Sequence, residues 1–218
     1  MTEMPTPPVL RLPSHEGRLL SAHLDRLSGW EPSTIVRVVA RARALGVYAA
    51  PPMEVISFVA LPLTEPVEGE VDITARATDL RRGLVEAGQS VELTLPGSIV
   101  GDSSLAVLPP ADSWQLPIAG VSGDIVPLVD DAVAEFRRRT ANGTDPQRLA
   151  QEIWDRPGFG GLPMRALHAA RRLGFLTADA SRVSACTCTG WKRLTTVRGQ
   201  VFVRAVAPAT RATLTVVR

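Results

Sequence analysis

Three alternating stretches decide the fold class: VRVVARARA at residues 36–44, VISFVALPL at residues 55–63 and VDITAR at residues 71–76. In the first stretch Val36, Val38 and Ala40 share one face, because successive side chains of a strand point to opposite sides. The third stretch alternates in the same way, and the second is a mostly apolar run. Consecutive strands without helices between them favour an antiparallel sheet over a doubly wound one. The sequence therefore predicts an α+β protein.

Helical periodicity flanks these strands. Leu20, His23, Leu24 and Leu27 recur at the spacing of one helix face, which predicts a helix from Ser14 to about Ser28. The residues before it are rich in proline and predict an extended arm. Further along the chain we expect a short helix at 79–87, strands at 90–95 and 105–108, a loop at 109–124 and a longer helix ending near 140.

The C-terminal part has its own pattern. Helices are expected from Pro146 and from about 163 to 173, joined by a glycine-rich turn, and strands at 183–189, 191–197 and 201–205. The last two strands are expected to pair as a hairpin across Arg198-Gly199. Two helices followed by a hairpin resemble a winged helix-turn-helix in order. Asn142-Gly143 marks the preferred boundary, so we expect one domain at 1–141 and a second at 142–218.

The charge is divided unequally along the chain. Residues 1–136 hold nine basic and eighteen acidic residues, whereas residues 137–218 hold fifteen basic and four acidic ones. A basic half favours an anionic partner, which could be nucleic acid, the acidic half of the same chain or a neighbouring subunit. Lys192 is the only lysine, a bias towards arginine that is typical of a bacterial genome rich in G and C.

Among functions that involve an external partner, the sequence leans towards nucleic-acid binding through the basic part. Arg165, His168 and Arg172 recur on one face of the predicted second helix, with Arg171 beside them. Such a helix can enter a major groove, and the hairpin can reach the phosphate backbone. The candidate contacts are Arg165, His168, Arg171, Arg172, Lys192, Arg193 and Arg198.

Two other functions stay open. Long loops often hold functional residues, so the loop at 96–124 could form a small-molecule site or an active site with Asp112, Trp114 and Asp124. Alternatively, the opposite charges could meet between subunits and drive self-association. An arginine-rich helix face can also be a solvated surface with no partner at all.

The sequence argues against several other classes of protein. It contains no apolar run long enough to span a membrane, and residues 1–13 do not have the pattern of a signal peptide, so we expect a cytoplasmic protein without a membrane partner. Cys186 and Cys188 have no second cysteine pair to complete a metal site. We find no cofactor motif and assign no catalytic residue, which favours a binding protein over an enzyme.

Overall fold

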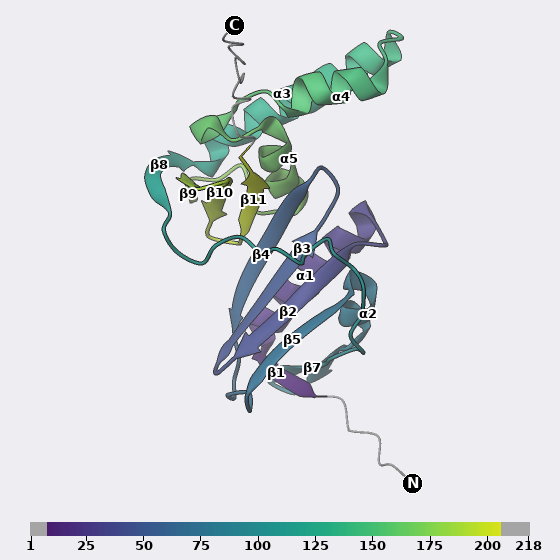
Figure 1. Ribbon diagram of the computed structural model, residues 1–218, viewed down its shortest axis with the longest axis vertical. Helices are drawn as coiled ribbons and strands as arrows, with labels where there is room; N and C mark the ends of the chain where they lie inside the picture. Colours follow the sequence, from purple (N-terminus) through teal and green to yellow (C-terminus); the bar gives the residue numbers. More distant parts are fainter. Residues whose placement is uncertain (1–7, 206–218) are drawn as a thin grey trace, which may run out of the picture.

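The fold consists of two halves joined edge to edge, described for residues 8–205 in a computed structural model (Figure 1). We call residues 8–94 the first half, 95–114 the linker and 115–205 the second half. The first half contains β1 (Val9–Pro13), α1 (Ser14–Trp30), β2 (Ile35–Arg41), β3 (Ala44–Ala50), β4 (Val55–Pro62), β5 (Glu70–Arg76), α2 (Ala77–Arg82), β6 (Leu84–Ala87) and β7 (Ser90–Thr94). The second contains β8 (Gln115–Val121), α3 (Ser122–Ala141), α4 (Pro146–Trp154), a 3-10 turn (Phe159–Gly161), α5 (Met164–Arg172), β9 (Arg182–Cys188), β10 (Trp191–Thr196) and β11 (Gln200–Arg204).

One antiparallel sheet of eight strands runs through both halves, in the order β5-β2-β3-β4-β11-β10-β9-β8. The halves meet where β4 pairs with β11, from Val55 opposite Val203 to Phe58 opposite Gln200. A second sheet of three strands, β1-β7-β6, packs against α1 in the first half. The large sheet is therefore continuous across the junction between two parts of the chain that lie far apart in sequence.

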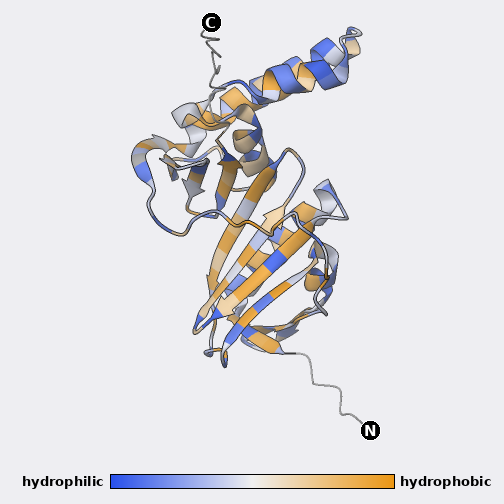
Figure 2. Cartoon of the chain, viewed as in Figure 1, coloured by the Kyte–Doolittle hydropathy of each residue, from blue (hydrophilic) through white to orange (hydrophobic). Residues whose placement is uncertain are grey.

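The helices share one face of the large sheet. The main core on this face joins Leu24 of α1, Val38 of β2 and Val203 of β11, all almost fully buried, with apolar residues of α2, α3, α4 and α5. The opposite face carries a smaller apolar cluster that includes Ile56, Trp191, Phe202 and the linker residue Leu105. Figure 1 shows the linker crossing the sheet on this face, and Figure 2 shows hydrophilic residues interspersed with apolar ones along α3 and α4.

The expected α+β composition is present, but the winged-helix-like arrangement predicted for the C-terminal part is wrong. The hairpin of β10 and β11 forms as expected, with Trp191 opposite Arg204. It is not a wing, because β11 pairs on its other edge with β4 and β10 pairs with β9. Helix α5 packs against β11 and β4 instead of projecting from a separate helical unit.

Several predicted elements also differ in detail. The helix expected at 79–87 ends at Arg82 and continues as β6, and the loop expected at 109–124 contains β8. Residues 105–108 form no strand. The extended arm contains β1, which pairs with β7, whereas residues 1–7 of that arm lie outside the described residues. Strand β3 was not expected.

Candidate nucleic-acid interface and junction cavity

The helix-bearing face presents basic side chains from both halves. Arg18 and Arg26 are exposed on α1, and Arg172 is exposed at the end of α5. Within residues 8–205, none of these three guanidinium groups forms an ion pair with a carboxylate. Arg18 and Arg26 come from the half of the chain with an acidic balance, so the overall charge asymmetry gave no reason to select them.

Three of the predicted contact residues are ion-paired. Arg165 pairs with Asp155, the Nε atom of Arg171 lies 3.4 Å from Oδ1 of Asp130, and Nη2 of Arg198 lies 3.7 Å from Oδ2 of Asp179. The last two distances are long for charge-assisted hydrogen bonds, which lie near 2.7–2.9 Å. Pairs of exposed groups contribute only about 0–1 kcal/mol each. A phosphate could therefore compete for Arg171 and Arg198.

Aromatic rings contact His168, which lies in the middle of the helix face predicted to bind nucleic acid. His168 stacks on Trp154 with ring centres 4.8 Å apart and meets the edge of Trp30 at 6.1 Å. Burial, with the nearby charges of Arg172 and Arg137, lowers the pKa of His168 to about 4. The guanidinium carbon of Arg172 lies 5.1 Å from the centre of the Trp30 ring. These contacts connect α5 to the end of α1.

The hairpin residues do not all share the face of α5. Arg193 lies 4.4 Å above the ring of Trp114, a linker residue that packs on Phe202 in the cluster on the opposite side of the sheet. Lys192 donates a hydrogen bond to the carbonyl oxygen of Gly161. The seven predicted nucleic-acid contacts are therefore spread over more than one surface.

The predicted ligand residues of the linker region are also dispersed. Trp114 is half-buried, and its indole nitrogen donates to the carbonyl oxygen of Pro110. Asp112 is exposed and accepts a hydrogen bond from Ser113, whereas Asp124 is exposed in the first turn of α3. None of these three lines the cavity between the two halves or the two smaller cavities beside Arg165. A site that uses all three stays a prediction.

One cavity lies at the junction of the halves, on the helix-bearing side. We call this space of about 640 Å³ the junction cavity. Its walls come from α1, from β4, from the segment after α5 and from the turn between β10 and β11. The β4 residues Val59–Leu61 extend beyond the last pair with β11, so that edge of β4 faces the cavity without a neighbouring strand from β11.

His23 is the unusual residue of this cavity. Its side chain is only 3% exposed, and neither ring nitrogen has a hydrogen-bond partner in the described chain. The ring stacks on Phe175 from the second half, with centres 5.3 Å apart. Burial, and secondarily the charge of Arg26, lowers the pKa of His23 to about 3. The sequence places His23 on the leucine face of its helix, which is correct but gives no hint of the cavity.

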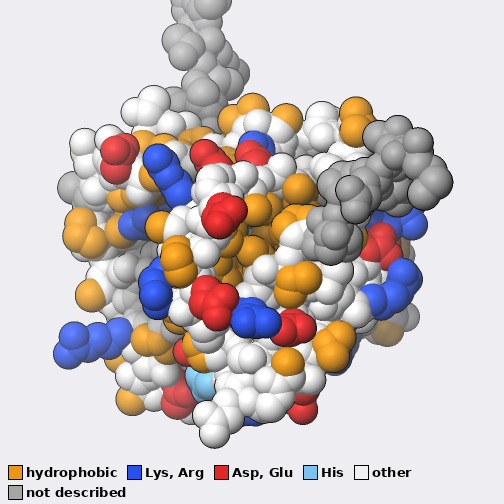
Figure 3. Space-filling view, turned by 90° about the horizontal axis from the view of Figure 1, so that it is seen from below, with side chains coloured by type: hydrophobic (Ala, Val, Ile, Leu, Met, Phe, Trp, Pro, Cys, Tyr) orange, Lys and Arg blue, Asp and Glu red, His pale blue; other side chains and the backbone are white. Residues whose placement is uncertain are grey.

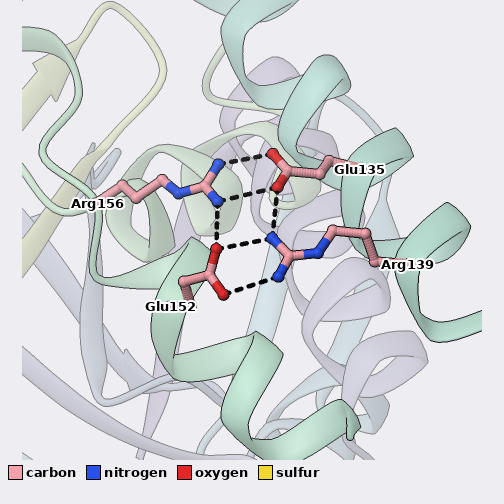
Figure 4. A network of polar contacts seen from close by, with 4 residues as sticks. All are labelled: Glu135, Arg139, Glu152 and Arg156. Carbon is pink, nitrogen blue, oxygen red and sulfur yellow. Dashed lines mark hydrogen bonds and ion pairs between the residues drawn. The ribbon is translucent and has the colours of Figure 1, made fainter. Parts of the chain in front are cut away.

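A network of four charged side chains joins α3 to α4 (Figure 4). Glu135 and Arg139 of α3, Glu152 of α4 and Arg156 just after it form a closed ring of hydrogen bonds of 2.6–2.9 Å. The two arginines lower the pKa of Glu135 and of Glu152 to about 2. Arg139 and Arg156 are thus neutralised within the second half and contribute little to an anion-binding surface.

The end of the first half carries no surface of a single charge. Figure 3 shows acidic and basic side chains interspersed around apolar ones on this end of the molecule. Among the described residues, no group of three or more His, Cys, Asp or Glu side chains is placed to hold a metal ion. No helix in the described chain has the length and apolar composition needed to cross a membrane.

Two family models match the chain, one after the other. The first, described as a domain of unknown function (DUF8010), matches residues 6–104, and the second, described as a domain of unknown function (DUF8185), matches residues 109–208. The interval between them lies within the linker. No curated protein matches the sequence.

Solved structures with a similar fold include bacterial sliding clamps. The DNA polymerase III subunit beta of Pseudomonas aeruginosa superposes with a TM-score of 0.55 at 14% identity, over 92% of this chain and 65% of that one. A putative DNA polymerase III beta subunit from Eubacterium rectale gives 0.60 at 11% identity, with the same coverage. The sliding clamp of Caulobacter crescentus gives 0.54 at 14% identity, over 94% of this chain and 67% of that one. The chain thus shares the clamp fold and spans about two thirds of a clamp chain.

Proposed function

We propose that this protein associates with duplex DNA through its helix-bearing face. The observation that carries the proposal is the clamp fold itself: one continuous sheet across two halves, with the helices of both halves on the same side. The three solved structures compared with this chain are named as DNA polymerase III beta subunits or sliding clamps. The basic groups available on this face are Arg18 and Arg26 of α1 and Arg172 of α5.

The proposed binding relies on phosphate contacts and reads no base sequence. Arginine presents a planar fork of donors that fits a phosphate group. Helix α5 is not free to act as a recognition helix, because His168 lies between two tryptophan rings and Arg165 pairs with Asp155. Affinity from phosphate contacts falls steeply with salt, because each contact releases counterions from the DNA.

The test is a titration of a fluorescein-labelled duplex of about 30 base pairs, followed by anisotropy between 25 and about 200 mM NaCl. We expect binding that weakens linearly in a plot of log K against log salt concentration. Arg18→Gln and Arg172→Gln should each reduce the slope by about one, which corresponds to one lost phosphate contact. A duplex of scrambled sequence should bind equally well.

Arg41→Gln is the matched control, because Arg41 is also exposed but lies at the end of β2. It should leave the slope unchanged. No measurable binding at the lowest salt concentration, or the same loss in all three variants, would exclude the helix-bearing face as a DNA interface.

We also propose self-association, on the separate observation that the large sheet has two end strands. The edge of β5 is partly used by the linker: the amide of Ile99 donates to the carbonyl of Thr74 at 2.7 Å, and Ser98 accepts from the Thr74 amide. The other end strand, β8, contains Pro117, which cannot donate to a ladder. A second copy would therefore pair beyond these two positions.

Light scattering after size exclusion at 50 and about 500 mM NaCl tests this proposal: a monomer at both salt concentrations contradicts it, and dissociation only at high salt indicates charge-driven contact.

A further inference from the structure

The charged side chains that line the junction cavity are all positive. Its titratable residues are His15, His23, Arg26 and Arg198, and no carboxylate is among the described residues that line it. Asp179, which lies 3.7 Å from Arg198, is outside the lining. The rest of the wall is mainly apolar. An apolar wall with a few convergent polar groups, in a volume of about 300–1,000 Å³, is the usual form of a small-molecule site.

A polar group in the wall is left without a partner. The imidazole of His23 has one N–H donor and one acceptor when neutral, and neither is satisfied by the described chain. Buried polar side chains are normally hydrogen-bonded, and His23 is one of several exceptions among the described residues. Its ring nitrogens have almost no accessible surface, so a ligand in the cavity would meet the exposed guanidinium of Arg26, one helical turn away, and not the imidazole.

We propose that the junction cavity binds a small anionic amphiphile: a carboxylate on an apolar acyl or aryl body. The carboxylate accepts hydrogen bonds from Arg26, and Arg198 adds a second positive charge from the turn between β10 and β11. The apolar body lies between α1 and β4, where Leu19 is half-exposed at 49%. This site goes beyond DNA association and is tested without DNA.

The experiment is calorimetric titration of the full chain with three probes: decanoate, acetate and decyltrimethylammonium. We expect decanoate to bind. Acetate should fail because it has no apolar body, and decyltrimethylammonium should fail because its head group has the same charge as the cavity wall. Equal binding of decanoate and decyltrimethylammonium would show a merely apolar surface and would overturn the proposal, as would no binding of decanoate.

Variants assign the binding to this cavity. Arg26→Gln and Arg198→Gln should each weaken decanoate binding by about tenfold or more, the usual effect of losing a charge-assisted hydrogen bond. Leu19→Asp should abolish it, because the new carboxylate repels the probe at the mouth of the cavity. The last variant should fold, since Leu19 is already half in water.

Two matched controls show whether decanoate binds in this cavity or at another surface. Leu128→Asp makes the same change on α3 at a leucine that is also 49% exposed, and should bind decanoate like the native protein. Arg18→Gln lies on the same helix as Arg26 but not in the cavity wall, and should reduce the salt dependence of DNA binding only. If the controls lose decanoate binding as the cavity variants do, the probe binds elsewhere and the assignment is wrong.

Discussion

A buried histidine, His23, and a half-buried one, His168, make the stability of this protein depend on pH. The folded-state pKa is about 3 for His23 and about 4 for His168, below the value of about 6.5 expected in an unfolded chain. Above about pH 6.5 both histidines are neutral in the folded and in the unfolded state, so they do not make the free energy of unfolding depend on pH. Below it the unfolded chain takes up protons that the folded chain does not, so the free energy of unfolding falls as the pH falls.

We expect urea unfolding to show this loss between pH 6.5 and about 4, with a slope of up to about 1.4 kcal/mol per pH unit for each histidine. His23→Phe and His168→Phe keep a flat ring against Phe175 and Trp154, and each should flatten part of the profile. His15→Gln changes an exposed histidine and serves as the control. A double variant as sensitive to acid as the native protein over this range would refute the assignment.

Single residues also explain why some predicted helices, loops and strands differ from the structure. The apolar spacing at 79–87 fits a helix, but a side chain at Gly83 would overlap the carbonyl oxygen of Thr94, and the chain turns there into β6. The content of Pro, Gly, Ser and Asp in residues 109–124 predicted a loop, yet an end strand such as β8 tolerates its proline, Pro117. In β3 the alternation of Leu45, Val47 and Ala49 was a usable signal that the alanine-rich composition obscured.

At the level of the elements, the charged network between α3 and α4 predicts a second, more acidic transition. The pKa of Glu135 and of Glu152 is held near 2 by hydrogen bonds from Arg156 and Arg139. A carboxyl group whose pKa is lower in the folded state stabilises the fold at pH values above its pKa in the unfolded chain, about 4.5. That stabilisation is lost as the pH falls towards 2. This range lies below the one in which the unfolded histidines take up protons.

Glu152→Gln should therefore lower the thermal midpoint at pH 7 by a few degrees and increase hydrogen exchange in α4. The difference should shrink at high salt and near pH 2, because all four side chains are at least partly exposed. Glu16→Gln on α1 is the control for removing one carboxylate. An unchanged exchange rate in α4 would mean that apolar packing alone, such as Phe136 on Trp154, holds the helix pair.

The elements themselves were easier to predict than their partners. The hydrophobic period located α1, α3, α4 and α5 and most strands, because this signal is local. The pairing of β11 with β4 joins residues about 145 positions apart, and no local pattern encodes it. For the same reason the sequence could propose basic contacts but could not show that carboxylates and tryptophans cover several of them. The boundary expected near residue 142 falls in the turn between α3 and α4, and it stays a prediction.

For the whole molecule, the junction should make the two halves unfold together. Phe175 is almost fully buried, stacks on His23 and fills the space above Gly199. Phe175→Ala should cost about 3–5 kcal/mol. It should also make amide hydrogen exchange faster in β9–β11 than in β2–β5.

Hydrogen exchange read by mass spectrometry measures both regions in one sample. Phe136→Ala, which removes a half-buried ring from the α3–α4 pair, should leave exchange in the two sheet regions coupled. If the two regions already exchange independently in the native protein, the junction does not couple the halves.

The ladder between β4 and β11 connects the two halves independently of the linker. Because backbone pairing and packed side chains hold the halves together at that ladder, peptide continuity through the linker is not the sole connection between them. Two separately expressed polypeptides, divided between residues 104 and 109, should then find each other in solution and rebuild the same eight-stranded sheet by fragment complementation.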